Sequence, residues 1–137
     1  MNYCLGFLTD PTGERILLME KRRPHWQVGL LNGIGGKLED EESGVEAMAR
    51  ECVEETGLDV NQWFALDTLT FPGGQVEVFH AVADLDRART TTDEPLRVIP
   101  LVEALSAPEK LVESVYGFLR QVQGRIPASP SPRRVHP

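Results

Sequence analysis

The sequence predicts an α/β fold in which two main helices pack against a central mixed sheet. Three observations support this prediction. Short apolar runs are bounded by turn residues, two longer segments have helical spacing, and the two kinds of segment interleave along 137 residues. Strands interleaved with well-separated helices favour a layered α/β sandwich. A chain of this length suits one compact domain with its own core.

The N-terminal part of the chain is expected to begin with an antiparallel hairpin. Residues Asn2–Leu8 and Arg15–Glu20 are mostly apolar, and the sequence DPTG at 10–13 between them is typical of a turn. Residues 21–31 are expected to be a loop. The segment 32–37, NGIGGK, contains too many glycines for a regular element, so it is expected to continue that loop.

A helix is predicted over Gly44–Thr56 by signals at both of its ends. Ser43 is a favourable N-cap, Glu46 completes a capping box, and Gly57 suits a left-handed C-cap. One face of this helix is expected to meet the core. The stripe on that face comprises Val45, Ala49, Cys52 and Thr56, with Met48 beside it.

The second half is expected to add three strands and a helix. Residues Trp63–Phe71 and Val76–Ala83 are predicted strands around a Phe-Pro-Gly-Gly turn, and Leu96–Ile99 is a short strand that follows a polar loop over 84–95. The second long helix is predicted over Pro108–Gln123. Its apolar positions at helical spacing are Leu111, Val115, Phe118, Leu119 and Val122.

The domain is accordingly placed at residues 1–123. Residues 124–137 form a tail rich in proline and serine, which is expected to be disordered. No apolar run is long enough to cross a membrane, and the apolar start of the chain is interpreted as a strand rather than a signal peptide. The two widely separated cysteines, without such a signal, favour the reducing cytoplasm.

The net charge of −7 is concentrated in one segment. Residues 39–59 contain nine acids and one base, a charge of −8, which leaves +1 for the rest of the chain. Carboxylates at this density repel one another and call for cations or open solvent. Such a surface repels nucleic acid, so a nucleic-acid partner is not expected.

Three glutamates on the predicted helix indicate a metal site. Glu51, Glu54 and Glu55 are related by three and four residues, so they occupy one arc of the helix, expected to lie away from the apolar stripe. Hard oxygen ligands grouped in this way suit Mg²⁺ or Mn²⁺. Metals held there can neutralise phosphate charge and activate a water, and a free carboxylate can act as general base. The alternative is a solvated acidic helix face.

The glycine-rich segment next to this helix supports the first interpretation. Its backbone can approach a phosphate or a metal closely, because glycine has no Cβ. Two other phosphate-binding glycine motifs are excluded. Leu31 stands where the first P-loop glycine belongs, and Leu38 follows Lys37 where serine or threonine is required; Leu38 also takes the position of the third glycine of the dinucleotide motif.

Residues Gly36–Leu58 resemble a complete Nudix box, which identifies the chain as similar to the Nudix hydrolases. The family pattern is Gly, five residues, Glu, seven residues, then Arg-Glu-hydrophobic-any-Glu-Glu-any-Gly-hydrophobic. The positions that match it are Gly36, Glu42, Arg50, Glu51, Cys52, Glu54, Glu55, Gly57 and Leu58. Cys52 fills an apolar position, and Asp40-Glu41 lacks the proline or glycine of many members. The resemblance implies the Nudix α/β/α sandwich.

The resemblance also implies roles for the residues of the box. Glu51, Glu54 and Glu55 would bind Mg²⁺, with Mn²⁺ as an alternative, and the carbonyl of Gly36 often joins them in this family. Glu51 or Glu54 would be the general base. Arg50 belongs to the catalytic part of the box, where with Glu42 it would hold the loop and the helix together.

Residues outside the box offer further candidates for metal and substrate. Glu94 precedes an expected strand, where many members place an additional metal-binding or catalytic carboxylate; the alternative is a surface acid. Asn32 corresponds to the base-binding asparagine of the MutT-homologue branch, or it only supports a turn before Gly33. Trp26 could stack on a base or pack its loop, and Lys37 could contact a phosphate or remain solvated.

The expected reaction is cleavage of a phosphoanhydride bond in a nucleoside diphosphate linked to another group. The leading substrate is a (d)NTP, converted to (d)NMP and pyrophosphate, with oxidised purine nucleotides as one possibility. The tryptophan and paired aspartates that the MutT-homologue branch uses late in the chain have no convincing equivalents here. Nucleotide sugars, dinucleoside polyphosphates and capped RNA ends are alternatives, as is a non-catalytic nucleotide-sensing module on the same fold.

Overall fold

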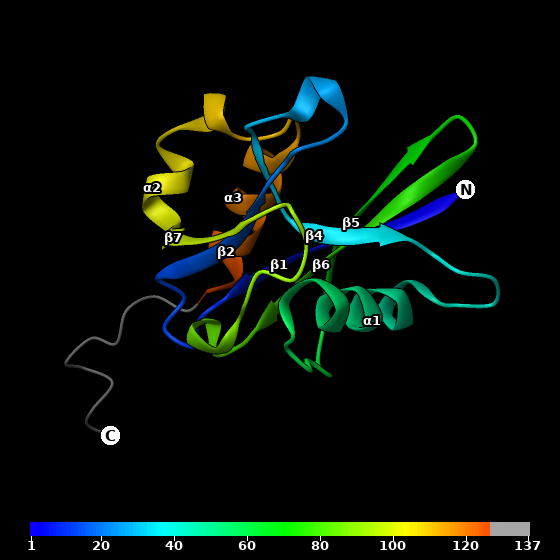
Figure 1. Ribbon diagram of the computed structural model, residues 1–137, viewed down its shortest axis with the longest axis horizontal. Coiled ribbons are helices and arrows are strands. Elements are labelled where there is room, and N and C mark those ends of the chain that lie inside the picture. Colours follow the sequence, from blue (N-terminus) through cyan, green and yellow to red (C-terminus); the bar gives the residue numbers. More distant parts are fainter. Residues whose placement is uncertain (127–137) are drawn as a thin grey trace.

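A seven-stranded mixed sheet forms the centre of the computed structural model, which describes residues 1–126 (Figure 1). The strands are β1 (Asn2–Thr9), β2 (Arg15–Glu20), β3 (Leu31–Asn32), β4 (Ile34–Lys37), β5 (Phe64–Phe71), β6 (Gly74–Val82) and β7 (Leu96–Pro100). The α-helices are α1 (Gly44–Thr56), α2 (Leu101–Leu105) and α3 (Val115–Arg125). Single 3-10 turns are η1 (His25–Gln27), η2 (Leu85–Arg87) and η3 (Pro108–Lys110).

Strand β1 is the centre of the sheet and is shared by three neighbours. The strand order is β3-β2-β1-β6-β5, while β4 also pairs with β1 and β7 pairs with β2. Strands β1 and β6 are parallel along their whole length, and the other pairs are antiparallel. Strand β4 pairs with residues 3–6 of β1, and β2 pairs with residues 8–9. The sheet is therefore mixed, as predicted.

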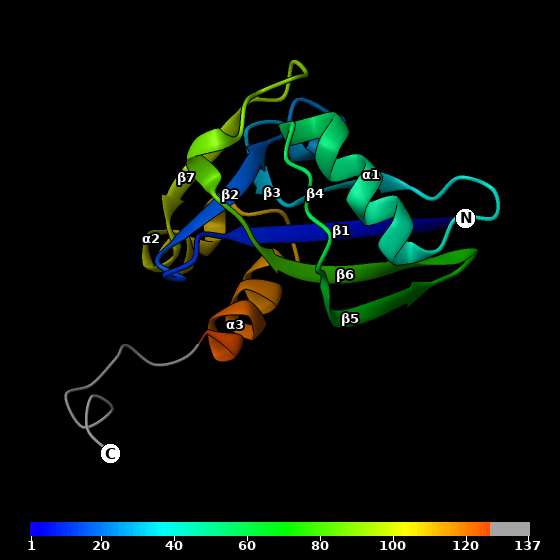
Figure 2. The same ribbon diagram turned by 90° about the horizontal axis from the view of Figure 1, so that it is seen from below.

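The helices lie on opposite faces of this sheet, α1 on one side and α3 on the other (Figure 2). Alternate β1 residues serve the two faces: Cys4 and Leu8 pack in the cluster that α1 covers, and Phe7 packs in the cluster that α2 and α3 cover. This arrangement confirms the α/β/α sandwich. The structure adds α2, a short third helix that the sequence did not predict.

Helix α1 has the bounds that the sequence predicted. The Ser43 side chain accepts a hydrogen bond from Glu46 N, the Glu46 side chain accepts one from Ser43 N, and Gly57 ends the helix with φ 77°. The β1–β2 hairpin also forms. In its turn, the Asp10 carboxylate accepts hydrogen bonds from Thr12 Oγ1 and from the backbone of Glu14 and Arg15. Local signals were sufficient for these elements.

The prediction that residues 32–37 are irregular was wrong. Residues 31–32 and 34–37 form strands β3 and β4, and β4 pairs with β1 from Tyr3↔Lys37 to Gly6↔Ile34. The glycines permit this close pairing. A Cβ at Gly35 would lie 2.1 Å from the Cys4 carbonyl oxygen, and one at Gly33 would lie 2.5 Å from that of Gly6. Here glycine allows backbone contact instead of breaking a strand.

The predicted helix over Pro108–Gln123 was wrong in its first half. That half contains only η3, after which Leu111 forms an isolated parallel bridge with Leu31, and Val112 N donates to Leu31 O at 2.9 Å. Ser114, with φ 78°, then turns the chain into α3. The five apolar positions are buried as expected. Their spacing was correct, but pairing with a distant segment decides the backbone.

The remaining bounds differ by small amounts. Strand β5 begins one residue later than predicted, β6 begins two residues earlier, and the expected loops 21–31 and 84–95 contain η1 and η2. Helix α3 ends at Arg125, two residues beyond the predicted domain boundary, and residues 127–137 of the expected tail lie outside the described part. Within residues 1–126, none of the helices has the length and apolarity needed to span a bilayer.

Candidate active site

Arg50 connects the helix α1 to the loop before it. Its Nε donates to Glu42 Oε2 at 2.7 Å and its Nη2 donates to Glu42 Oε1 at 2.9 Å, a bidentate pair. Nη2 also donates to Lys37 O at 3.2 Å. The Arg50 guanidinium holds the pKa of Glu42 at about 2. Arg50 thus fixes the end of β4 and the loop against the helix.

The same guanidinium reaches two of the three predicted metal ligands. Nη1 donates to Glu51 Oε2 at 3.1 Å and to Glu54 Oε2 at 3.0 Å. The Glu54 side chain is 53% exposed, and among residues 1–126 only Arg50 forms an ion pair with it. Glu54 is therefore the most accessible of the three carboxylates, while Glu51 is largely covered.

Glu51 lies directly against the backbone of β4. A Cβ at Gly36 would be 2.4 Å from Glu51 Oε2, so the bare glycine backbone makes room for this carboxylate. Burial, opposed by Arg50, raises the pKa of Glu51. A partly desolvated carboxylate packed against the backbone of β4 is an arrangement that a cation would stabilise.

Glu55 of α1 contacts the neighbouring residue of β4, Gly35. Its Oε1 accepts a hydrogen bond from Gly35 N at 2.8 Å. Burial raises the pKa of Glu55 to about 7, the hydrogen bond from Gly35 opposes the rise, and the nearby charge of Glu51 adds to it. Two carboxylates that both resist ionisation therefore converge on the Gly35–Gly36 backbone.

The expectation that the glutamate arc lies away from the packed face was wrong. Val45, placed on the core stripe, is 43% exposed, whereas the buried positions of α1 are Gly44, Ala47, Met48, Cys52 and Thr56. The packed face is rotated toward Glu51 and Glu55, because Gly36 leaves space for the Glu51 carboxylate and Gly35 N donates a hydrogen bond to Glu55 Oε1. The site is therefore partly buried between α1 and β4, and is not a solvent-facing helix surface. We call this contact, formed by Glu51 and Glu55 against Gly35 and Gly36, the seam.

Glu94 lies near this seam but has partners of its own. Its carboxylate accepts hydrogen bonds from Lys21 Nζ at 3.1 Å, Arg22 N at 2.7 Å and Arg23 N at 3.3 Å. Burial alone would raise its pKa, yet these donors hold the pKa below its usual value. The charge of Lys21 lowers the pKa of Glu55, and the charge of Glu94 raises it.

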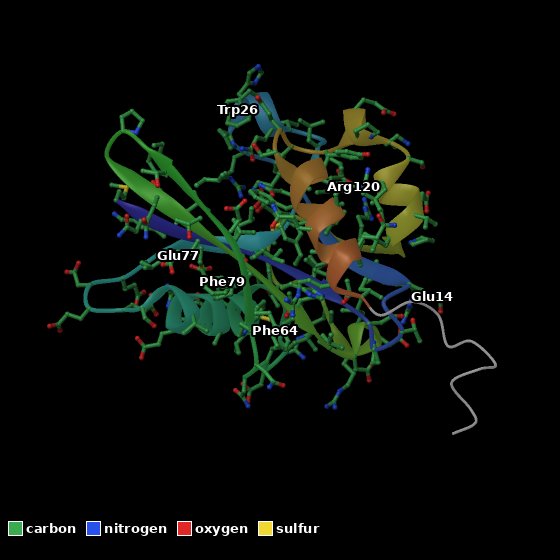
Figure 3. The ribbon with its side chains drawn as sticks, turned by 180° about the vertical axis from the view of Figure 1, so that it is seen from behind. Glu14, Trp26, Phe64, Glu77, Phe79 and Arg120 are labelled. Carbon is green, nitrogen blue, oxygen red and sulfur yellow. The ribbon has the colours of Figure 1, made fainter. Side chains whose placement is uncertain are left out.

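The three predicted substrate-binding residues lie on β3, on β4 and on the β2–β3 loop. Asn32 Oδ1 accepts a hydrogen bond from Gly33 N at 2.7 Å, so this oxygen supports the turn between β3 and β4. Lys37 is exposed at the end of β4. Trp26 is 65% exposed on the β2–β3 loop, at the top of the molecule in Figure 3. In the described part of the chain, none of these side chains hydrogen bonds to the glutamates.

Sequence reasoning missed Lys21 and the backbone of Gly35. Lys21 directly follows the buried strand β2, and a cation at the end of a central strand is a signal that could have been used. Gly35 N, which orients Glu55, had no signal because the pairing of β4 was not expected.

The candidate ligands have the oxygen chemistry that Mg²⁺ prefers, but their side chains are not gathered around a single ion position. Glu51, Glu54, Glu55 and the Gly36 carbonyl offer hard oxygen atoms of the type that Mg²⁺ accepts. Within residues 1–126, no three His, Cys, Asp or Glu side chains are grouped as ligands of one ion. Arg50 instead supplies the compensating charge for Glu51 and Glu54.

A separate hollow of about 930 Å³ lies beyond the C-terminal end of α1. Its lining includes Asp59, Phe64, Arg87 and Arg89, and it contains none of the glutamates of the box. We place the candidate site at the seam, because the carboxylates and backbone that converge there can bind a divalent cation. The residues that line the hollow include no such group of ligands.

Comparison with known proteins agrees with the fold and the box. A family model described as the NUDIX domain matches residues 4–122. A structure from a study of MutT from Aliivibrio salmonicida and Vibrio cholerae has a TM-score of 0.76 and 21% identity, and covers 90% of this chain and 97% of that chain. The NUDIX domain of Shewanella oneidensis NrtR, complexed with ADP ribose, has a TM-score of 0.76 and 16% identity, and covers 93% and 88%. No curated protein matches.

The protein defined by this fold and box belongs to the Nudix family. Membership supports a Nudix hydrolase that acts on derivatives of nucleoside diphosphates. At these identities the two solved structures establish the shared fold and leave the substrate to be tested.

The pKa of Glu55 leads to a testable pH dependence. Between pH 4.5 and about 7, the folded metal-free chain holds a proton that the unfolded chain has lost. The stability from this proton is present below pH 4.5 and is lost as the pH rises through 7. His80 acts oppositely: burial, with Arg125, lowers its pKa from 6.5 to about 4, so stability is lost as the pH falls through that range.

A difference between variants separates the two effects. As the pH falls from 8 to 5 in metal-free buffer, the unfolding free energy of wild type minus that of Glu55→Gln is expected to increase by about 2–3 kcal/mol. The His80 contribution cancels in this subtraction. Urea denaturation across the pH range measures it, and a constant difference would contradict the burial of Glu55.

Proposed function

We propose that the protein is a Mg²⁺-dependent hydrolase that converts a nucleoside triphosphate to a nucleoside monophosphate and pyrophosphate. The observation that carries this proposal is the convergence of the Glu51 and Glu55 carboxylates on the Gly35–Gly36 backbone. Burial disfavours the ionised form of both carboxylates. A divalent cation bound between them would offset this cost, which supports a metal-binding role over a purely structural one.

The metal ligands in this proposal are Glu51, Glu54, Glu55 and the carbonyl of Gly36. A bound Mg²⁺ would neutralise phosphate charge and lower the pKa of a water. Mn²⁺ has a similar preference for oxygen ligands and is expected to substitute for it.

The remaining residues are assigned by their contacts. Glu54, the most accessible carboxylate, and Glu51 are the candidates for the general base that accepts a proton from the attacking water. Arg50 keeps both of them in place through its bidentate hold on Glu42. Lys37, exposed next to Gly36, is suited to contact a phosphate of the substrate.

Recognition of the base is assigned to the two residues proposed outside the box. The side-chain amide of Asn32 can present a donor to a purine edge while its oxygen supports the turn at Gly33. Exposed Trp26 offers a ring for stacking. Oxidised purine nucleotides are one substrate group that these side chains could serve.

A turnover panel tests the proposal. Normal and oxidised dNTPs, NTPs, nucleotide sugars, dinucleoside polyphosphates and ADP-ribose would each be incubated with and without Mg²⁺, scoring pyrophosphate separately from orthophosphate. ADP-ribose is included because the NUDIX domain of NrtR was solved with it. We expect Mg²⁺-dependent pyrophosphate release from a triphosphate.

Other outcomes have distinct meanings. Release of two monophosphates from a nucleotide sugar would keep the hydrolase and replace the substrate class. Tight binding of one nucleotide without turnover would instead support the non-catalytic sensing module. Isothermal titration with each nucleotide, in Mg²⁺ and in chelator, separates this result from an enzyme whose substrate is missing from the panel, because only the former shows a tight ligand.

A further inference from the structure

Glu94 is a buried charged residue, and both oxygens of its carboxylate accept hydrogen bonds. It is 7% exposed, and its two oxygens accept from three donors. Oε1 takes the ammonium of Lys21, and Oε2 takes the backbone N–H groups of Arg22 and Arg23. The charge of this buried carboxylate is thus compensated by Lys21, and both of its oxygens already have donors within the chain.

The donors belong to one end of the β2–β3 loop. This loop closes on itself through Lys21 N to Leu30 O at 2.8 Å and Gly29 N to Lys21 O at 2.8 Å. The segment between these closures carries Trp26. Glu94 therefore connects an already closed loop to the segment before β7, and the two loops lie side by side at the end of α1 (Figure 2).

The loop is anchored to Glu94 mainly through its backbone. Side-chain ion pairs on the surface contribute little to stability, and the nearby Arg23–Asp93 pair is of that exposed kind. Two backbone amides on one buried carboxylate are different, because removing the acceptor leaves both of them without a partner. Loss of Glu94 should release residues 22–23 and, with them, the segment that carries Trp26.

We propose that Glu94 is a positioning residue for the Trp26 loop, and that the metal ligands are confined to Gly36 and the glutamates of α1. Lys21 compensates the charge of Glu94, so the negative charge available to a metal at the seam comes from the glutamates of α1. The substrate part of this inference rests on the proposed function: a correctly placed loop contacts the part of the nucleotide that does not react, so its loss weakens binding more than chemistry.

The first test uses metal alone, without any nucleotide. Mn²⁺ binding, followed by the electron paramagnetic resonance of the free ion, would be compared among wild type, Glu94→Gln and Glu55→Gln. We expect the dissociation constant of Glu94→Gln to stay within about twofold of wild type, and that of Glu55→Gln to rise about tenfold or more. Equal losses in both variants would overturn the proposal and make Glu94 a ligand.

The second test follows the amides directly. Hydrogen exchange at Arg22 and Arg23 is expected to accelerate at least about tenfold in Glu94→Ala, because each amide loses its acceptor. Glu94→Gln keeps an acceptor oxygen and should restore part of the protection. Asp93→Asn is the matched control, since Asp93 contacts Arg23 only through its side chain. Unchanged exchange in Glu94→Ala would refute the anchoring role.

The third test separates binding from chemistry. With the substrate found by the panel, Glu94→Ala is expected to raise KM about tenfold and to change kcat less than about threefold. A fall in kcat like that of Glu55→Gln, with KM unchanged, would overturn the proposal. Hydrogen exchange needs no substrate, so failure of the proposed function on the panel remains distinguishable from failure of this inference.

Discussion

Replacing Glu55 with glutamine is expected to reduce kcat/KM by about 10²- to 10³-fold while leaving the chain folded. The amide has the shape of the carboxylate, and its oxygen can still accept the hydrogen bond from Gly35 N. Burial raises the pKa of Glu55, so a neutral group in its place does not destabilise the metal-free chain at neutral pH. What is lost is the anionic oxygen ligand that the proposed function assigns to Mg²⁺.

The measurement is Mg²⁺-dependent turnover of the substrate identified by the panel, together with urea denaturation of the same preparations. Glu103→Gln is a matched control, because Glu103 is an exposed acid on α2. It carries the same change of charge and should leave turnover within about twofold of wild type. If Glu55→Gln remained fully active with normal metal dependence, the seam between α1 and β4 would not be the active site.

A second large effect is expected from Gly35→Ala, this time on stability. Gly35 has φ 151°, and an added Cβ would lie 2.1 Å from the Cys4 carbonyl oxygen and 3.0 Å from Leu5 Cα. These are backbone atoms of β1 and cannot rotate away, so β4 must separate from the central strand. We expect the unfolding free energy to fall by about 3 kcal/mol or more, measured by urea denaturation.

Gly117→Ala provides the comparison for this variant. Gly117 is exposed in α3, and a Cβ added to it would meet open space, so alanine should be neutral or stabilise the helix by up to about 1 kcal/mol. A Gly35→Ala protein within about 1 kcal/mol of wild type would show that β4 does not pair with β1 as closely as described.

The sequence was most informative where the determinants are local. Ser43, Glu46 and Gly57 set both ends of α1 by bonds within a few residues, and the predicted bounds were correct. The strand at residues 34–37 was missed because glycine is a poor strand former in isolation. The close pairing with β1, which leaves no room for a Cβ at Gly35, requires glycine there, and that pairing is not visible in the local sequence. Residues 111–114 were misjudged for the same reason, since Leu31 lies far away in sequence.

In the candidate site, too, local features could be predicted and features that depend on distant contacts could not. The spacing of the glutamates correctly grouped them on α1, but the direction in which the group faces depends on which neighbour leaves room for side chains. Gly36 leaves that room for Glu51, and the backbone N–H of Gly35 binds Glu55, so both side chains turn inward. Likewise, the position of Glu94 before a strand suggested a ligand, and only the structure brings Lys21 and two loop amides to it.

The end of α3 has a practical consequence for anyone shortening the chain. Arg125 Nε donates to His80 Nδ1 at 3.3 Å, and its guanidinium lies 4.4 Å from the centre of the Phe64 ring. Since the His80 nitrogen accepts this bond, Nε2 carries the hydrogen that binds Thr9 Oγ1 at 2.8 Å. Truncation after residue 123, where sequence alone placed the boundary, would remove the cation that lies over the Phe64 ring. It would also remove the donor to His80 Nδ1, which fixes the tautomer that links β6 to Thr9 of β1. An expression boundary after Ile126 preserves both.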